Sequence, residues 1–308
     1  MYLIEEFAND YKERKMSRRD LLRRALLTTG SIPVTASVLT MLGCGGDDAG
    51  DKPADGATTN TLVPATVVPS PVPATPVVSA ATGEVKFKGP ASDILGYVAY
   101  PEGATGKKFP AVLIIHENRG LTDHFRDVAR RYAKEGFVAF AIDLVSRKGG
   151  TGTDNAVNSG ALGGAVPEDL IADIQAGISY LKALPVVTPT AIGVTGFCFG
   201  GGYAFEAAIS SKDLKAVVPY YGTVRRMEEL GTTGAAVLVM YGANDARVTG
   251  QAEQVRGRLT TAGKPFEIKI FDGANHAFFN DTGANYNAAV AAEAWTLTLA
   301  WFRKYLVA

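Results

Sequence analysis

Several residue types that would point to particular functions are scarce in this 308-residue sequence. Two cysteines are too few for a disulfide scaffold or a cysteine-rich zinc site, and three histidines leave little material for a histidine-built metal centre. Charge of one sign is also lacking, because 31 Lys and Arg balance 31 Asp and Glu. A chain without a basic excess has no bulk charge with which to bind nucleic acid. We therefore expect no metal site and no nucleic-acid partner.

The first 44 residues have the features of an export signal. Residues 1–24 contain seven Lys or Arg and five Asp or Glu, and the uncharged run Ala25–Gly43 follows them. Residues 17–23 (SRRDLLR) resemble a twin-arginine signal, whose pathway exports folded proteins. The alternative, a retained anchor helix, is disfavoured by Gly30 and Pro33 within the apolar run.

A lipid anchor and a tether are expected next. Residues 41–45 (MLGCG) resemble a bacterial lipoprotein processing site, although Met41 stands where leucine is usual. The resemblance implies that Cys44 is lipidated; simple signal cleavage is the alternative. Residues 45–82 are rich in Pro, Thr, Ala, Gly and Asp, which predicts a disordered or semi-rigid linker. We expect a periplasmic or cell-surface protein whose contact with the membrane is this anchor or signal.

Residues 83–308 are expected to form one domain with the α/β architecture. Short β-branched segments alternate with helical patterns, which predicts a mostly parallel sheet of about eight strands with helices on both faces. The first two segments follow each other without a helix, so we expect an antiparallel edge there. The expected strands are Glu84–Lys88, Leu95–Tyr100, Val112–Glu117, Val138–Asp143, Ala191–Phe197, Ala216–Tyr221, Ala236–Tyr241 and Phe266–Phe271.

Three helices have clear signals. We expect Thr122 to cap one helix and Pro167 to open another. Near the end, apolar residues repeat at helical spacing and indicate a stripe that packs on the core. The stretch Gly149–Gly164 is rich in Gly, Asn and Thr, which favours a mobile flap or a plain surface insertion. The apolar stripe comprises Val290, Ala294, Leu297, Trp301 and Tyr305.

The most informative motif is GFCFG at residues 196–200. It lies between an expected strand and the small-residue helix start Gly200–Gly202, which is the pattern of a nucleophile elbow with Cys198 as nucleophile. Small neighbours are needed because the sharp turn leaves no room for Cβ atoms. A helix N-terminus also favours a thiolate. The alternative is a buried cysteine that acts only as a small apolar residue.

Two further residues complete a catalytic set. Asp245 and His276 each follow an expected strand, so both should lie at the same edge of the sheet as Cys198. His276 would act as general base or as ion-pair partner of the thiol, and Asp245 would fix its tautomer. Asp272 and Asp143 are alternative acids, each more simply explained as a turn or strand-end residue.

With these residues the sequence resembles the dienelactone hydrolase family of the α/β-hydrolase fold, over about residues 84–307. The resemblance implies a fourth catalytic residue, Glu117, at the end of an early strand, which takes the thiol proton when substrate binds. Backbone N–H groups of Phe199 and Asn118 would then form the oxyanion hole. The other two histidines, His116 and His124, are expected to be packed and surface residues respectively.

The sequence departs from the family in its substrate-binding arginines. One of these follows the catalytic histidine closely, but residues 279–281 read FND here. Arg119, Arg147 and Phe278 are the remaining candidates for substrate binding. The sequence therefore disfavours an acidic lactone as the substrate.

The sequence predicts a monomeric hydrolase of a carboxylic ester or lactone that uses a Cys-His-Asp triad and an acyl-thioester. It needs no cofactor. Two alternatives stay open: an α/β hydrolase acting on another acyl substrate, such as a thioester or peptide, and a non-catalytic surface or solute-binding lipoprotein.

Overall fold

The computed structural model describes residues 81–307. The expected export signal (1–44), the lipidation site Cys44 and nearly all of the linker (45–82) lie outside the described residues. None of the helices between residues 81 and 307 is long and apolar enough to cross a bilayer.

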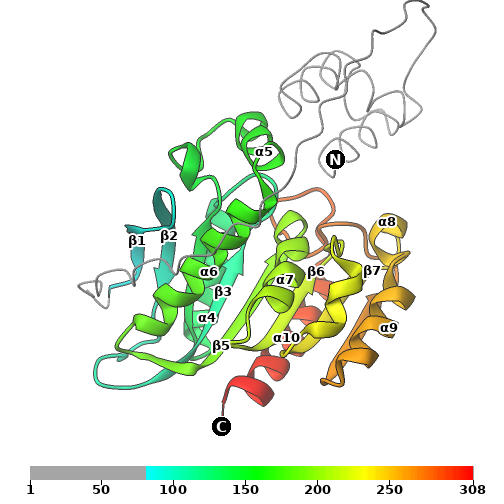
Figure 1. Ribbon diagram of the computed structural model, residues 1–308. Helices are drawn as coiled ribbons and strands as arrows, with labels where there is room; N and C mark the ends of the chain where they lie inside the picture. Colours follow the sequence, from blue (N-terminus) through cyan, green and yellow to red (C-terminus); the bar gives the residue numbers. More distant parts are fainter. Residues whose placement is uncertain (1–80, 308) are drawn as a thin grey trace, which may run out of the picture. The chain divides into compact units, whose positions relative to one another are not determined.

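The described part of the chain is built on one eight-stranded sheet with the order β1-β2-β4-β3-β5-β6-β7-β8 (Figure 1). β2 is antiparallel to both of its neighbours, and every other pair is parallel. The predicted architecture and its antiparallel edge are therefore confirmed. The strands are β1 (Gly83–Lys88), β2 (Asp93–Ala99), β3 (Phe109–Ile115), β4 (Val138–Asp143), β5 (Val187–Phe197), β6 (Leu214–Tyr220), β7 (Ala236–Gly242) and β8 (Phe266–Phe271).

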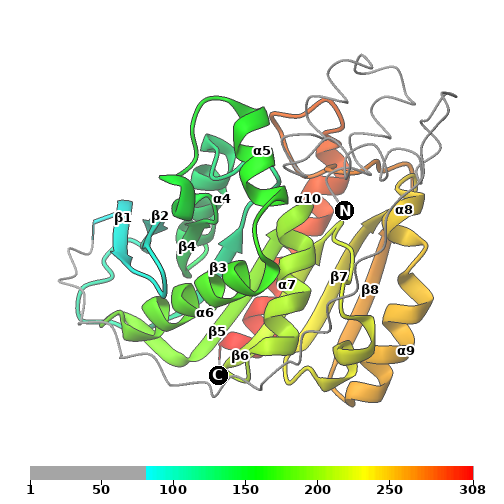
Figure 2. The same ribbon diagram turned by 45° about the horizontal axis from the view of Figure 1, so that its top comes forward.

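The central strands are buried on both faces because helices cover the sheet on each side. α4 (Asp123–Lys134) and α10 (Ala288–Leu306) lie on one face, whereas α6 (Pro167–Ala183), α7 (Phe199–Ser210) and α9 (Ala252–Ala262) lie on the other (Figures 1 and 2). This explains why β3 reads as a continuous apolar run. The shorter helices are α5 (Asn155–Gly163), α8 (Ala246–Thr249) and the 3₁₀ helices η1 (Ser146–Lys148) and η2 (Met227–Thr232).

The predicted helices are present where the sequence indicated them, but some of their predicted contacts are not. Pro167 opens α6 as predicted. Thr122 precedes α4, but its side chain makes no capping hydrogen bond. The stripe on α10 is displaced as well: Ala294 and Trp301 are buried, whereas Val290 is half-buried. The buried face passes instead through Ala291, Ala294, Thr298, Leu299, Trp301, Phe302 and Leu306.

The glycine-rich stretch expected as a flap contains a helix. Asp154 caps α5 by accepting hydrogen bonds from the N–H groups of Ala156 and Val157. Asn158 and Ser159 on this helix are buried, and both bind the loop that follows β3. The composition suggested a mobile flap or a plain surface insertion, and in the structure polar contacts join the segment to this loop.

Three strands end earlier than expected, β2 at Ala99 instead of Tyr100 among them, and for the other two the difference matters for function. β3 stops at Ile115 and β6 at Tyr220, whereas the sequence suggested ends at Glu117 and Tyr221. Glu117 and Tyr221 therefore lie just past the sheet, at the carboxyl edge where side chains can meet a ligand.

Candidate active site

Cys198 lies in a strained turn between β5 and α7. Its φ and ψ are 56° and −113°, a conformation that residues with a Cβ rarely adopt. A Cβ on Gly196 would lie 2.0 Å from the Gly200 carbonyl oxygen, and one on Gly200 would lie 2.3 Å from that of Ile115. The sequence therefore folds into an elbow here because only glycine fits beside Cys198.

His276 and Asp245 meet at the same edge of the sheet. Asp245 follows β7 and His276 follows β8, and the Nδ1 of His276 lies 2.5 Å from the Oδ2 of Asp245. Asp245 is 8% exposed, so this carboxylate is largely shielded from water. The contact leaves the second ring nitrogen, Nε2, available for chemistry on the other side of the imidazole.

Cys198 interacts with the histidine of this pair. Burial lowers the pKa of His276, but Cys198 and Asp245 together hold that pKa well above its usual range. A raised pKa means that the imidazolium is the preferred form at neutral pH. The imidazole of His276 thus interacts with the Asp245 carboxylate through Nδ1 and also with Cys198.

Glu117 is held by two residues that sequence reasoning missed. Tyr221 Oη donates to Glu117 Oε1 at 3.1 Å, and Asn280 Nδ2 donates to Glu117 Oε2 at 2.8 Å. Burial, followed by the neighbouring Glu117, raises the pKa of Tyr221 well above its usual value, so the phenol stays an O–H donor. Its ring also lies edge-on to His276, with centroids 5.1 Å apart.

The signals for these two residues were weak. Tyr221 read as the last residue of a strand, and its positive φ of 38° is invisible in the sequence. Asn280 lies in the FND segment, which stood out in the sequence only because it lacks an arginine. It contacts Glu117 across 163 residues of chain, and no local pattern reports such a pairing.

The two expected oxyanion donors lie in segments that touch each other. Phe199 is the first residue of α7, and Asn118 follows Glu117 in the loop after β3. The close approach of Gly200 to the end of β3 brings these segments together. The carbonyl of Asn118 accepts a hydrogen bond from Ser159 at 2.8 Å.

The three candidates for substrate binding are placed very differently. Arg119 is exposed in the loop after β3. Arg147 is tied to α6 by ion pairs with Asp173 at 2.8 Å and Asp169 at 3.0 Å, so its charge is already neutralised. Phe278 is completely buried, with its ring 5.2 Å from that of Tyr221. Phe278 therefore supports the site from within the core.

The alternative acids and the other histidines have structural surroundings. Asp272 is exposed, and Asp143 is buried and accepts hydrogen bonds from Thr151. His124 is not a surface residue: it is buried and its Nδ1 lies 2.7 Å from Asp281 Oδ1. His116 is fully buried, as the sequence suggested.

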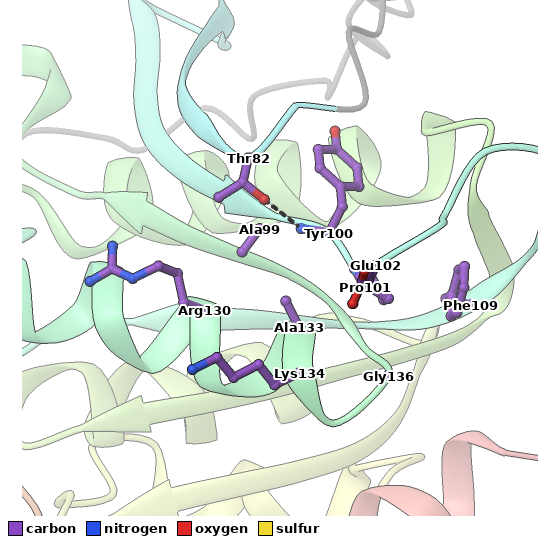
Figure 3. A pocket seen from close by; sticks show the side chains of 10 residues that line it. All are labelled: Thr82, Ala99, Tyr100, Pro101, Glu102, Phe109, Arg130, Ala133, Lys134 and Gly136. Carbon is purple, nitrogen blue, oxygen red and sulfur yellow. Dashed lines mark hydrogen bonds between the residues drawn. The ribbon is translucent and has the colours of Figure 1, made fainter.

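A cavity of about 590 Å³ lies away from these residues (Figure 3). It is lined by Phe109 at the start of β3, by Arg130 and Lys134 of α4, and by Tyr100, whose N–H donates to Thr82 Oγ1. These positions lie at the amino ends of the parallel strands, opposite the edge that carries Cys198. Among residues 81–307 no cluster of three or more metal-ligating side chains occurs.

Comparisons with known proteins agree with this fold. A chain described as "MGS-M1, an alpha/beta hydrolase enzyme" from a deep-sea metagenome superposes with a TM-score of 0.57 at 21% identity, covering 74% of this chain and 99% of that one. A structure described as "Putative Dienelactone Hydrolase" from Klebsiella pneumoniae gives a TM-score of 0.67 at 28% identity, covering 73% and 99%. The fold is therefore that of the α/β hydrolases.

The sequence comparisons define the class more closely. The model of the dienelactone hydrolase family matches residues 94–306. A Synechocystis protein named "Putative carboxymethylenebutenolidase" is 33% identical over 219 residues, which is 66% of this chain and 88% of that protein. The chain belongs to the dienelactone hydrolase family and is a hydrolase.

Proposed function

We propose that this hydrolase cleaves a carboxylic ester or lactone through Cys198, with His276 and Asp245 as its partners. The observation that carries the proposal is the contact between His276 and Asp245 at the strand edge that also bears the strained Cys198. A strained nucleophile, a histidine with a raised pKa and a shielded carboxylate together have little structural purpose, but they are what acyl transfer requires.

The proposed reaction has two steps. The Cys198 thiolate attacks the carbonyl carbon, and the oxyanion that forms is held by the N–H groups of Phe199 and Asn118. The ester C–O bond breaks, the imidazolium of His276 protonates the leaving alkoxide, and an acyl-thioester remains. Neutral His276 then takes a proton from water, which attacks the thioester and releases the acid and the thiolate.

Glu117 has a distinct place in this scheme. The family resemblance implies that it accepts the thiol proton when substrate binds, which is the alternative to the proton transfer to His276 used in the two steps above. In this chain its two oxygens are hydrogen-bonded to Tyr221 and Asn280, both uncharged donors. To free the Glu117 carboxylate, a substrate would have to break two hydrogen bonds from uncharged groups and not an ion pair.

The charges around the site favour an uncharged substrate. Residues 279–281 contain no arginine, although the family uses one near the histidine, and the Arg147 charge is neutralised by Asp173 and Asp169. Arg119 is the remaining cation among the candidates. We therefore propose a neutral ester or lactone rather than an acidic lactone, bound by a monomer.

We also propose that the enzyme is exported through the twin-arginine-like segment and tethered through Cys44. The test is fractionation of cells producing the full chain, with Arg18→Lys/Arg19→Lys and Cys44→Ala variants. Loss of export in the first and loss of membrane association in the second are expected; unchanged distribution in both would contradict the proposal.

The function is tested by turnover of p-nitrophenyl acetate and of a dienelactone. Cys198→Ala should lower kcat by at least about 1,000-fold, because the nucleophile is lost while the fold stays. A preference for the neutral ester supports the reading of the site charges. Equal turnover by folded, reduced wild type and Cys198→Ala would refute the catalytic assignment and favour a binding lipoprotein.

A further inference from the structure

His116 is a buried histidine whose protonation state can be read from its contacts. It follows β3, and its side chain is fully buried. The N–H of Leu144 donates to Nε2 at 3.0 Å, so Nε2 must carry the lone pair. The proton therefore resides on Nδ1, which donates to the carbonyl oxygen of Glu117 at 2.6 Å.

The surroundings keep this imidazole neutral. Burial lowers the pKa of His116, although Asp143 acts in the opposite direction. Asp143 Oδ1 lies 3.8 Å from Nε2, and that carboxylate is already satisfied by Val145 N–H and by Thr151. A neutral ring with one donor and one acceptor matches its two partners without a surplus proton.

The bond to Glu117 fixes a peptide unit that matters for catalysis. The carbonyl of Glu117 and the N–H of Asn118 belong to the same planar peptide, and in a trans peptide they point in opposite directions. Whatever holds the carbonyl therefore sets the direction of the N–H. Gly120 N–H also donates to this oxygen, at 3.2 Å, so the peptide is held from two sides.

Similar hydrogen bonds hold the next two residues of the loop. Three consecutive carbonyls accept a side-chain hydrogen bond: Glu117 from His116, Asn118 from Ser159, and Arg119 from Asn158 at 3.1 Å. Their three donors come from the buried histidine and from α5. A loop fixed by its carbonyls presents its N–H groups in a defined direction.

The elbow lies directly against this loop. A Cβ on Gly200 would come within 2.5 Å of the carbonyl oxygen of His116 itself. The peptide between Glu117 and Asn118 thus neighbours the turn that carries Cys198 and Phe199. This position suits an oxyanion donor. The effect of such a donor depends on where its N–H group lies and points, to within a fraction of an ångström.

The geometry points to His116 as a positioning residue: its Nδ1–H holds the Glu117 carbonyl so that the Asn118 N–H is aimed at the substrate oxyanion. The inference rests on the proposed function, because it needs an acyl transfer in which an oxyanion develops. His116 itself touches neither substrate nor thiol in this scheme. It acts through the orientation of one peptide unit.

Two substitutions separate the two bonds of the ring. His116→Asn places an amide nitrogen where Nδ1 stands and keeps the donation to Glu117. His116→Gln places an amide oxygen where Nε2 stands and keeps only the contact with Leu144. We expect His116→Gln to lower kcat for p-nitrophenyl acetate by about 10- to 100-fold with KM little changed, since one oxyanion donor is misaligned rather than lost. His116→Asn should retain most of kcat.

Alkylation of Cys198 by iodoacetamide provides the control. Attack on a saturated carbon develops no oxyanion, so its rate should be the same in wild type, His116→Asn and His116→Gln. Slower alkylation parallel to kcat would mean a general disturbance of the elbow and would overturn the proposal. Equal kcat in the two variants would also overturn it.

A third variant covers the case in which neither His116 variant folds. Ser159→Ala removes the bond to the next carbonyl from a helix at the periphery, and a lower kcat with unchanged alkylation is expected. Unchanged kcat in that variant would then overturn the proposal. Failure of the proposed function would look different, because wild type itself would show no turnover that depends on Cys198.

Discussion

The two halves of the site are built in different ways. The elbow half consists of Cys198, Asp245 and His276, each just past a strand, and its central turn is enforced by contacts that leave no room for a Cβ. The loop half consists of residues 116–120 with Tyr221 and Asn280, and hydrogen bonds hold it together. A turn without room for a Cβ cannot accept any larger side chain at its glycines. A loop held by several hydrogen bonds is weakened only partly when one of them is removed. The two halves should therefore respond differently to mutation.

The largest effect is expected where the two halves touch. Gly200→Ala would place a Cβ 2.3 Å from the backbone oxygen of Ile115, so the backbone must move. We expect a loss of about 4 kcal/mol or more in the free energy of unfolding, measured by urea denaturation, or no folded protein. Gly257→Ala is the matched control, because this glycine on α9 has nothing within 4 Å. It should be neutral or stabilising by up to about 1 kcal/mol.

Asp245→Asn tests the elbow half without disturbing its backbone. The amide cannot stabilise the imidazolium of His276, so that group's pKa should fall and the thiolate–imidazolium pair should be depleted at neutral pH. We expect kcat to drop by about 100-fold or more. Asp272→Asn, which alters an exposed acid beside the same histidine loop, should leave kcat unchanged. Similar losses in both would remove Asp245 from the triad.

Tyr221→Phe tests the loop half. It removes one of the two donors on the buried Glu117 carboxylate and leaves Asn280 in place. A hydrogen bond to a charged group contributes about 1.5–3 kcal/mol of stabilisation. We therefore expect kcat to fall roughly 10-fold.

The neighbouring Tyr220 provides the control. Its hydroxyl binds Thr298 and the Ala294 carbonyl in the core, so Tyr220→Phe should lower stability by about 1 kcal/mol and keep kcat. If Tyr220→Phe impaired turnover as much as Tyr221→Phe, the bond to Glu117 would have no special role.

The smallest effect is expected at the edge of the loop half. Asp154→Ala removes the N-cap of α5 and should lower the stability of this helix by about 1 kcal/mol. We expect faster hydrogen exchange of the α5 amides and a small decrease in kcat, because Ser159 and Asn158 hold the loop from this helix. Thr122→Ala changes an N-cap residue that makes no side-chain bond and should have less effect on α4. Equal exchange rates in wild type and Asp154→Ala would show that other contacts hold α5.

The same contrast explains what the sequence could predict. Strand periodicity and glycine spacing are local, so the sheet, the elbow at Cys198 and the positions of Asp245 and His276 beyond strand ends followed from the residues themselves. The partners of Glu117 did not, because Tyr221 and Asn280 reach it across 104 and 163 residues. The same reason hid α5, whose polar residues are buried only by contacts with the loop after β3.

Some predictions for single residues were wrong because they depended on burial, which the sequence does not show. Phe278 was a candidate for substrate binding, but it packs against Tyr221 inside the core. His124 read as a surface residue, although α4 buries it beside Asp281. Arg147 was also a candidate for substrate binding, but α6 supplies two aspartates that bind it.

The central claim is that Cys198 carries the acyl group during turnover, and trapping that intermediate tests it most directly. Wild-type protein mixed with p-nitrophenyl acetate is quenched with acid during turnover, and intact and peptide masses are recorded. The account predicts one added acetyl group on the peptide that contains Cys198, lost at the rate of turnover and absent in Cys198→Ala. Turnover that proceeds with the acetyl group on another residue would contradict the account.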